Sequence, residues 1–433
     1  MSIVDKQIGE KTMPRLAIEG GEPIRSIPFP TRHLFGEEEK AAAMAVFDQA
    51  IESGNAFGYN GPEEQAYERE FAEYLGGGYA DMVSSGTAAV FTALGALQSE
   101  PLSEVIVPPI TDPGGVMPVP MLNCIPIVAD AHPGSYNVGA EQIEQVISPR
   151  TRAIIVAHIA GEPADMDPIL EVALAHDLPV IEDCAQAHGA LYKGRLVGTM
   201  GTIAAFSTMS GKHHATAAQG GVVFTQDEDL LWEAKRFADR GKPFNTQYTT
   251  NVRMGLNLNG NDLSAAVGRV QLRKLPDIIA HRRRFAEMLT QEMEGLRSVR
   301  LGWMPEGAMG VYWFLRPHLD RSRLAVDKST FVEALAAEGI PCSLEYRAVQ
   351  SEARWFNERI TYGTSGYPWT DPRYTGHPSR TFPIPNCLAS VESHFTIPMH
   401  EGYGEAEAHS IAAALRKVES AYLKEPPGSD SVD

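Results

Sequence analysis

The stretch of sequence that decides the fold reads Val180-Ile181-Glu182-Asp183-Cys184-Ala185-Gln186 and resumes, after a turn, with Ala204-Ala205-Phe206-Ser207-Thr208-Met209-Ser210-Gly211-Lys212. Two short apolar runs in it, residues 179–182 and 203–207, are bounded by glycine and polar turns, which predicts two buried strands. Asp183 and Gln186 follow the first run, and Ser207 and Lys212 close the second. Open α/β sheets bind ligands at the carboxyl ends of their strands. A carboxylate, a hydroxyl and a lysine at that edge indicate a phosphate-bearing cofactor that needs an acid partner and an amine.

The surrounding sequence predicts more strands of the same kind, alternating with helices. Five further strands are expected at residues 81–83, 105–107, 125–128, 153–157 and 222–224. Helical spacing of apolar residues predicts helices at 37–52, 63–75, 88–97, 141–147, 169–176, 262–275 and 279–296. Seven short strands interleaved with helices are typical of an α/β fold, a mostly parallel sheet with helices on both faces.

Two domains are expected from the change of character near residue 290. Residues 14–290 would form a large α/β domain that includes an extended, proline-containing N-terminal arm at 16–30. Residues 291–425 would form a smaller α+β domain, with strands at 298–301, 311–315 and 341–345 and helices at 329–338 and 405–422. The aromatic and proline-rich segment 355–385 has no legible period.

The composition excludes several classes of protein. A chain of 433 residues with 43% hydrophobic residues can bury a large core, and a net charge of −18 disfavours nucleic acid or an anionic membrane as a partner. The four cysteines have neither metal nor disulfide spacing. No signal pattern and no apolar run of about 18 residues occur, so we expect a cytoplasmic protein.

Each chemical motif also has a simpler structural interpretation. Ser84-Ser85-Gly86-Thr87, between a strand and a helix, fits an anion site at the helix N-terminus or a serine cap. Lys212 fits an amine of depressed pKa in a desolvated site, or an exposed loop lysine. Asp183 fits a partner for a pyridine nitrogen, or a capping residue.

His158 with Asp165-Met166-Asp167 invites a metal site or a glycosyltransferase D-x-D motif. The flanking prolines favour a strand–loop–helix connection in which Asp167 caps the helix that begins near Pro168. We therefore expect no metal site.

Taken together, these pieces resemble the DegT/DnrJ/StrS family of sugar aminotransferases, which depend on pyridoxal phosphate and have the type I (aspartate aminotransferase-like) fold. The resemblance is carried in order by Gly61-Pro62-Glu63, Ser85-Gly86-Thr87-Ala88-Ala89, Gly161-Glu162-Pro163-Ala164-Asp165-Met166-Asp167, Glu182-Asp183-Cys184-Ala185-Gln186-Ala187, Phe206-Ser207 with Lys212, and Gln219-Gly220-Gly221. It is strongest between residues 16 and 275.

The resemblance implies a role for individual residues. Lys212 would form the internal aldimine, a Schiff base with the cofactor, and would carry protons; Asp183 would pair with the pyridine nitrogen, and Gln186 would lie against the ring. The phosphate would be held by Gly86, Thr87 and Ser207. Asn251 and Arg253 resemble a segment that reaches the active site of a neighbouring subunit, which implies a homodimer with its active sites at the interface.

Two departures from the family pattern surround the substrate. Asp112 stands where an aromatic residue usually covers the cofactor ring, and the lysine loop reads Thr208-Met209-Ser210-Gly211-Lys212-His213-His214. The arm Leu16-Ala17-Ile18-Glu19-Gly20-Gly21-Glu22-Pro23 resembles the branch that acts on cyclitols and aminohydroxybenzoate precursors. Candidates for the substrate pocket are Asp112, His213, Tyr346, Arg347 and the segment 355–385.

The resemblance implies an aminotransferase that moves an amino group from glutamate or glutamine to a keto-sugar, a nucleotide-linked keto-sugar or a cyclitol ketone. One alternative is a sugar dehydratase of the same family, in which histidine replaces the lysine; Lys212 disfavours it, although His213 is adjacent. Another is a regulator that binds pyridoxal phosphate without turnover, to which the unusual Asp112 loop points. A metal-dependent glycosyltransferase that uses Asp165 and Asp167 is the remotest.

Overall fold

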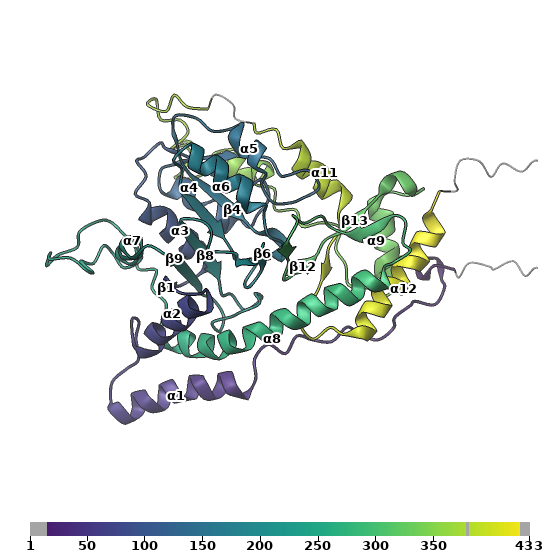
Figure 1. The fold of residues 1–433 in the computed structure, drawn as a ribbon, viewed down its shortest axis with the longest axis horizontal. Coiled ribbons are helices and arrows are strands. Elements are labelled where there is room, and N and C mark those ends of the chain that lie inside the picture. Colours follow the sequence, from purple (N-terminus) through teal and green to yellow (C-terminus); the bar gives the residue numbers. More distant parts are fainter. Residues whose placement is uncertain (1–14, 378–380, 425–433) are drawn as a thin grey trace, which may run out of the picture.

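The computed structural model describes residues 15–377 and 381–424, and its centre is a seven-stranded sheet in the order β1-β9-β8-β5-β4-β2-β3 (Figure 1). The strands are β1 (Tyr79–Val83), β2 (Glu104–Val107), β3 (Ile125–Val128), β4 (Thr151–Ala157), β5 (Val180–Asp183), β8 (Ile203–Ser207) and β9 (Gly221–Thr225). β9 runs antiparallel to β1 and β8, and the other pairings are parallel. The mostly parallel sheet predicted from the sequence is confirmed, and each expected strand ends within two residues of its predicted position.

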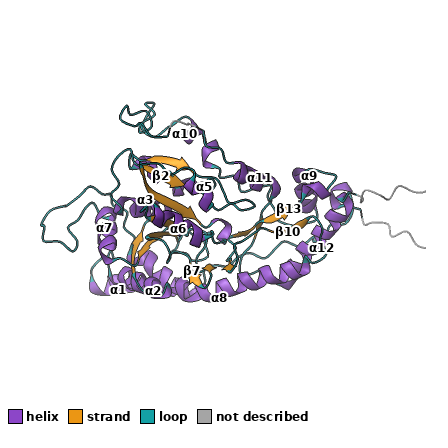
Figure 2. Ribbon diagram, turned by 45° about the horizontal axis from the view of Figure 1, so that its top comes forward, coloured by secondary structure: helices purple, strands orange, loops and turns teal. Residues whose placement is uncertain are grey.

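Helices cover both faces of this sheet (Figure 2). Side chains alternate along a strand, so Ile155 of β4 packs on the face with α3 (Gly86–Ala96) and α7 (Glu228–Ala238), whereas Val156 faces α5 (Ala140–Glu144) and α6 (Met166–Ala175). The β1, β8 and β9 part of that second face packs against α2 (Pro62–Tyr74) and α8 (Asp262–Glu292). α1 (Glu37–Ser53) lies outside, along α8.

The two helices expected at 262–275 and 279–296 are instead the single helix α8, with Pro276 in its interior. A proline inside a helix costs about 3 kcal/mol through its missing N–H and a steric clash. Leu272 and Leu275, before the proline, are buried against the sheet, and Phe285 and Leu289, after it, are buried in a second core. Each such side chain contributes about 1.5–3 kcal/mol on burial, so packing at both ends outweighs the proline.

The second core is formed by the C-terminal part of the chain, residues 297–424, together with the C-terminal end of α8 and Leu16 of the N-terminal arm. Its elements are β10 (Val299–Leu301), β12 (Phe314–Leu315), β13 (Pro317–Leu319), β14 (Ile397–Pro398), α9 (Lys328–Ala337), α10 (Arg354–Asn357), α11 (Pro385–Ser393) and α12 (Glu405–Tyr422). The division into two domains stays a prediction, and its end points, Pro14 and Glu425, lie outside the described residues.

Of the strands expected in this part, the one at 311–315 is shorter than predicted and the one at 341–345 is not formed. Only Phe314 and Leu315 of the stretch 311–315 form a strand, because the N–H groups of Val311 and Trp313 donate to a loop, at Gly161 and Ala160. The stretch 341–345 contributes a single bridge to Thr396. A small sheet of β6 (Leu191–Tyr192), β7 (Arg195–Leu196) and β11 (Ala308–Met309) joins the two parts of the chain. Within the described residues, no helix has the length and apolar character needed to cross a membrane.

Candidate active site

Six strands, β1, β2, β3, β4, β5 and β8, point their carboxyl ends to one edge of the sheet, and a cavity of about 240 Å³ opens at this edge. The residues that line it include Ser85, Gly86, Thr87, Thr111, Asp112, Gly114, Gly115, His158, Asp183, Gln186, Ser207, Lys212 and Gln219. Seven of the eight residues expected to hold the cofactor are therefore brought together. The eighth, Asn251, does not line this cavity.

The N-terminus of α3 forms one end of the cavity. Ser85 caps the helix, since its Oγ accepts a hydrogen bond from Ala88 N at 3.0 Å. The first N–H groups of a helix have no intrahelical acceptor and favour an anion. A Cβ on Gly86 would lie 2.6 Å from Cβ of Ser207, so only glycine lets the helix start come this close to β8. The capping and the anion-binding interpretations are therefore compatible.

Asp183 is buried at the floor of the cavity, on the α3 face of the sheet. Its Oδ1 accepts a hydrogen bond from Ala185 N at 3.1 Å, so it also caps the turn that follows β5. Burial raises the pKa of its carboxyl, against the Ala185 hydrogen bond and the nearby charge of Lys212. A cationic N–H donor in the cavity would relieve this cost by pairing with the carboxylate.

Lys212 is 6% exposed, so it is not an exposed loop lysine. Burial lowers the pKa of its amine to about 8, although the charges of Asp183 and Asp112 oppose the change. Its Nζ lies 3.8 Å from the centre of the Trp313 ring. A lysine with this pKa is neutral in an appreciable fraction near neutral pH, as a nucleophile or a general base requires.

Residues far away in the sequence anchor the lysine loop. Trp313 Nε1 donates to Gly211 O at 2.9 Å, and Arg32 of the N-terminal arm donates to Lys212 O at 2.7 Å and to His213 O at 3.2 Å. Glu401 orients Arg32 through an ion pair of 2.8 Å. The sequence motifs did not reveal Trp313 or Arg32, because Trp313 lies in a stretch predicted only as a strand and Arg32 lies outside every motif.

Of the substrate-pocket candidates that the structure describes, only Asp112 lines the cavity itself. Its carboxylate accepts a hydrogen bond from Gly114 N at 2.9 Å. His213 is fully buried and its Nε2 hydrogen-bonds Val311 O at 3.0 Å. Tyr346 lies beside the cavity, since its hydroxyl accepts a hydrogen bond from Gln186 Nε2 at 3.1 Å. Arg347 is exposed and pairs with carboxylates near it in the sequence.

The segment 355–385 contributes side chains to the core rather than to the cavity. Trp369 is buried, and Trp355 and Phe382 are packed against the same hydrophobic clusters. Residues 378–380 lie outside the described part of the chain.

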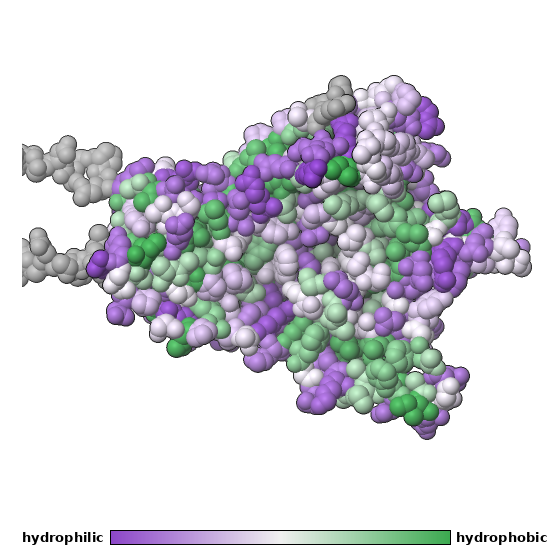
Figure 3. Space-filling view, turned by 180° about the vertical axis from the view of Figure 1, so that it is seen from behind, coloured by the Kyte–Doolittle hydropathy of each residue, from purple (hydrophilic) through white to green (hydrophobic). Residues whose placement is uncertain are grey.

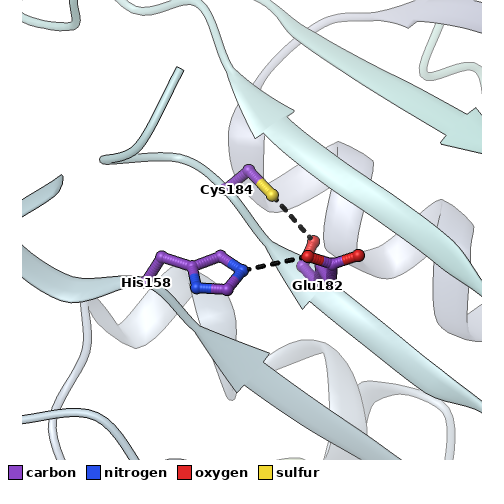
Figure 4. A group of neighbouring side chains, drawn as sticks. All are labelled: His158, Glu182 and Cys184. Atoms are coloured by element: carbon purple, nitrogen blue, oxygen red, sulfur yellow. Dashed lines mark hydrogen bonds and ion pairs between the residues drawn. The ribbon is translucent and has the colours of Figure 1, made fainter. Parts of the chain in front are cut away.

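His158, Glu182 and Cys184 have potential ligand atoms within 4.8 Å of one another (Figure 4). His158 Nδ1 accepts from Ala164 N at 3.0 Å, so its Nε2 carries the proton and donates to Glu182 at 3.1 Å. Burial also raises the pKa of the Cys184 thiol well above its usual value. Three backbone N–H groups complete the carboxylate's partners: those of Gly198, Met200 and Gly201. Hydrogen bonds therefore already use these atoms.

The predicted helix cap at Asp167 is wrong. The helix α6 begins after Asp165, whereas Asp167 lies in its first turn and pairs with Lys193, at 2.7 Å, and with Arg195. Asp165 accepts a hydrogen bond from the Tyr192 hydroxyl at 2.5 Å. The two cations and the tyrosine account for both carboxylates, which leaves the D-x-D interpretation without support.

Asn251 and Arg253 lie on the loop that follows α7 and extends away from the sheet (Figures 1 and 2). Asn251 is exposed and donates to Arg240 O at 2.6 Å. Arg253 is held within its own chain, by an ion pair with Glu233 of 2.8 Å and a hydrogen bond to Gly95 O. Neither side chain reaches the cavity of its own chain.

Comparison with known proteins identifies this arrangement. An aminotransferase from Psychrobacter cryohalolentis is 27% identical, with a TM-score of 0.77 over 91% of this chain and 99% of that one. DesV of S. venezuelae, solved with a ketimine intermediate, is 27% identical, with a TM-score of 0.72 over 88% and 95% of the two chains. A 3-amino-5-hydroxybenzoic acid synthase is 25% identical, with a TM-score of 0.75 over 92% and 100%.

The fold and the lysine cavity define a type I, pyridoxal-phosphate-dependent aminotransferase, as the sequence predicted. The model of the DegT/DnrJ/EryC1/StrS aminotransferase family matches residues 37–416. The chain belongs to this family.

Proposed function

We propose that this aminotransferase moves an amino group from glutamate or glutamine to a keto-sugar, a nucleotide-linked keto-sugar or a cyclitol ketone. The observation that carries the proposal is the convergence of the buried amine of Lys212 and the carboxylate of Asp183 on one cavity. The sugar acceptors follow from the resemblance of the sequence motifs to sugar aminotransferases. Similarity to a 3-amino-5-hydroxybenzoic acid synthase supports the branch that acts on cyclitols and aminohydroxybenzoate precursors.

The residues of the cavity fit pyridoxal phosphate. When bound, this cofactor supplies an electron sink for the carbon that gains or loses the amino group. Asp183 would keep the ring nitrogen protonated. The neutral amine of Lys212 would carry a proton from the donor's α-carbon to the cofactor in the first half of the reaction, and from the cofactor to the carbonyl carbon of the acceptor in the second. Gln186 would lie beside the ring with Asp112 at the cavity mouth, and the phosphate would be held by Gly86, Thr87 and Ser207.

Neither enzymatic alternative has an observation in its favour. In a dehydratase, histidine would take the place of the lysine, but here Lys212 lines the cavity and His213 hydrogen-bonds Val311 O on another side. The glycosyltransferase interpretation fails because Asp167 pairs with cations of its own chain. The third alternative is a regulator that binds pyridoxal phosphate without turnover. It predicts that neither glutamate nor glutamine converts the bound cofactor to its amine form.

A homodimer is part of the proposal. The outer helix α1 exposes Met44, Phe47 and Ile51, by 52%, 43% and 78%, and Figure 3 shows the apolar side chains gathered over this helix at the lower right. Patches of this kind mark protein interfaces. A second copy would cover them, and its projecting loop would bring Asn251 toward the phosphate end of the cavity. Ile51→Lys should then yield monomers in light scattering, and an unchanged dimer would contradict the placement of the interface.

The acceptor is tested by isotope transfer. Purified enzyme is incubated with glutamate or glutamine labelled with ¹⁵N at the α-amino group, together with one keto-sugar, one nucleotide-linked keto-sugar or one cyclitol ketone. Mass spectrometry should find the label in an amino product of one of these classes. Transfer only to simple 2-oxo acids, with none to any ring ketone, would contradict the proposed acceptors.

A further inference from the structure

We propose that Trp313 is a positioning residue for Lys212: its indole holds the lysine side chain by its face and the lysine backbone by its N–H. The inference rests on the proposed role of Lys212. Trp313 lies in the C-terminal part of the chain, 101 residues after the lysine, and no sequence motif pointed to it. The inference therefore assigns a function to a residue in a stretch that was predicted only as a strand.

Two independent contacts carry this inference. The Nζ of Lys212 lies 3.8 Å from the centre of the Trp313 ring, within the distance at which an ammonium group is attracted to an aromatic face. Trp313 Nε1 donates to Gly211 O at 2.9 Å. One side chain therefore fixes both the tip of the lysine and the peptide that precedes it.

Trp313 itself is held firmly. Its backbone N–H donates to Ala160 O at 2.7 Å, next to the sheet edge. Its ring packs against Phe314 and Tyr346, at centroid distances of 5.7 and 6.3 Å, and Tyr346 is in turn hydrogen-bonded to Gln186. The indole is therefore held in place by groups other than the lysine, so it can fix the position of the lysine side chain.

The indole is uncharged, and its face lies against the tip of the lysine. The charges that face the lysine amine are Asp183 and Asp112, so the indole is a neutral third neighbour that favours its charged form.

The test measures Lys212 in the cofactor-free full-length protein. Dinitrofluorobenzene reacts only with the neutral amine, so the labelling rate of the Lys212 peptide against pH, read by mass spectrometry, gives the pKa of the lysine. We expect a pKa near 8 in the wild type and a value lower by about 0.5–1 unit in Trp313→Leu, because the ring that favours the cation is gone. Trp313→Phe, which keeps a ring face, should restore most of the difference.

The backbone contact has its own measurement. Amide hydrogen exchange in the peptide 208–214 should quicken in both variants, since neither can donate to Gly211 O. Trp303→Leu is the matched control: Trp303 stacks on His132 away from the cavity, so this change should leave labelling and exchange unaltered.

Identical labelling and exchange profiles in wild type and Trp313→Leu would overturn the inference. If Trp313→Leu does not fold, unchanged exchange in Trp313→Phe would do the same. Because the cofactor is absent from these measurements, their outcome is separate from the proposed function. A wild-type protein that never binds pyridoxal phosphate would contradict that function while leaving the lysine contact measurable.

Discussion

Two parts of the site differ in how they are built. The sheet wall, which lines the cavity, consists of residues at strand ends, such as Gly86, Asp183 and Ser207, each fixed by the strand that precedes it. The loop wall lies behind the lysine loop, outside the cavity lining, and includes Trp313 and Tyr346, which are held by hydrogen bonds and ring contacts. The sheet wall therefore meets the bound molecule directly, whereas the loop wall acts on it through Lys212 and Gln186.

The largest effect is expected for Lys212→Ala, because Lys212 lines the cavity and is also the residue that the loop wall contacts. Removing the amine abolishes the proton transfers, and we expect kcat to fall by about 10²- to 10⁴-fold. The visible absorbance of bound cofactor should be lost as well. Lys193→Ala, which removes an exposed lysine, should leave both unchanged, and an active Lys212→Ala enzyme would show that the lysine has another role.

Next in size is the contrast between two carboxylates that line the cavity, the buried Asp183 and the exposed Asp112. Asp183→Asn removes a charge-assisted hydrogen bond to the ring nitrogen and should lower kcat/KM by about 10- to 100-fold. Asp112→Asn keeps the shape of the side chain at the cavity mouth. This variant should change kcat/KM by less than about threefold, because Asp112 is exposed. Steady-state kinetics compares the two variants, and equal losses would mean that Asp112 takes part in the chemistry as well.

Gly86→Ala tests the packing of the sheet wall. The added methyl group would meet Cβ of Ser207 at 2.6 Å, and overpacking of this kind costs about 1–3 kcal/mol. Cofactor affinity, measured by equilibrium titration, should fall by about 5- to 100-fold. Gly58→Ala places the same group in open space, so its affinity should equal that of the wild type; a matching loss there would point to a general effect on stability.

The pH dependence of cofactor capture is a smaller effect. Since burial lowers the pKa of Lys212 to about 8, the neutral amine is the minor form below that pH and the major form above it. The rate at which the cofactor-free protein binds pyridoxal phosphate should rise about tenfold per unit up to pH 8 and then level off. Stopped-flow absorbance measures this rate, and a rise that continues to pH 10 would indicate an ordinary exposed amine.

The sheet wall could be predicted from the sequence because its residues follow a local rule. β-branched runs end in polar residues, and parallel strands bring those ends together, so Gly86, Asp183 and Ser207 were placed without any knowledge of tertiary contacts. Pro276 shows the opposite case: a local helix breaker was overridden by burial at both ends of α8. Propensity is a weak guide where packing on two sides competes with it.

The loop wall could not be predicted because its contacts join distant segments. Trp313 and Arg32 both bind the lysine loop, yet they belong to the C-terminal part and to the N-terminal arm. His213 is adjacent to Lys212 in sequence, but its ring turns away to Val311. The partners of these side chains are backbone carbonyl groups, whose positions depend on the tertiary fold. The periodicity of the sequence carries no information about them.

The measurement that tests the central claim most directly is an absorbance spectrum of the purified protein, taken before and after addition of glutamate or glutamine without acceptor. We predict a visible band of lysine-bound cofactor that shifts to the amine form with one of the two donors. A cofactor band that neither donor changes would contradict the proposed transfer, and the absence of any band after addition of pyridoxal phosphate would contradict the role of Lys212.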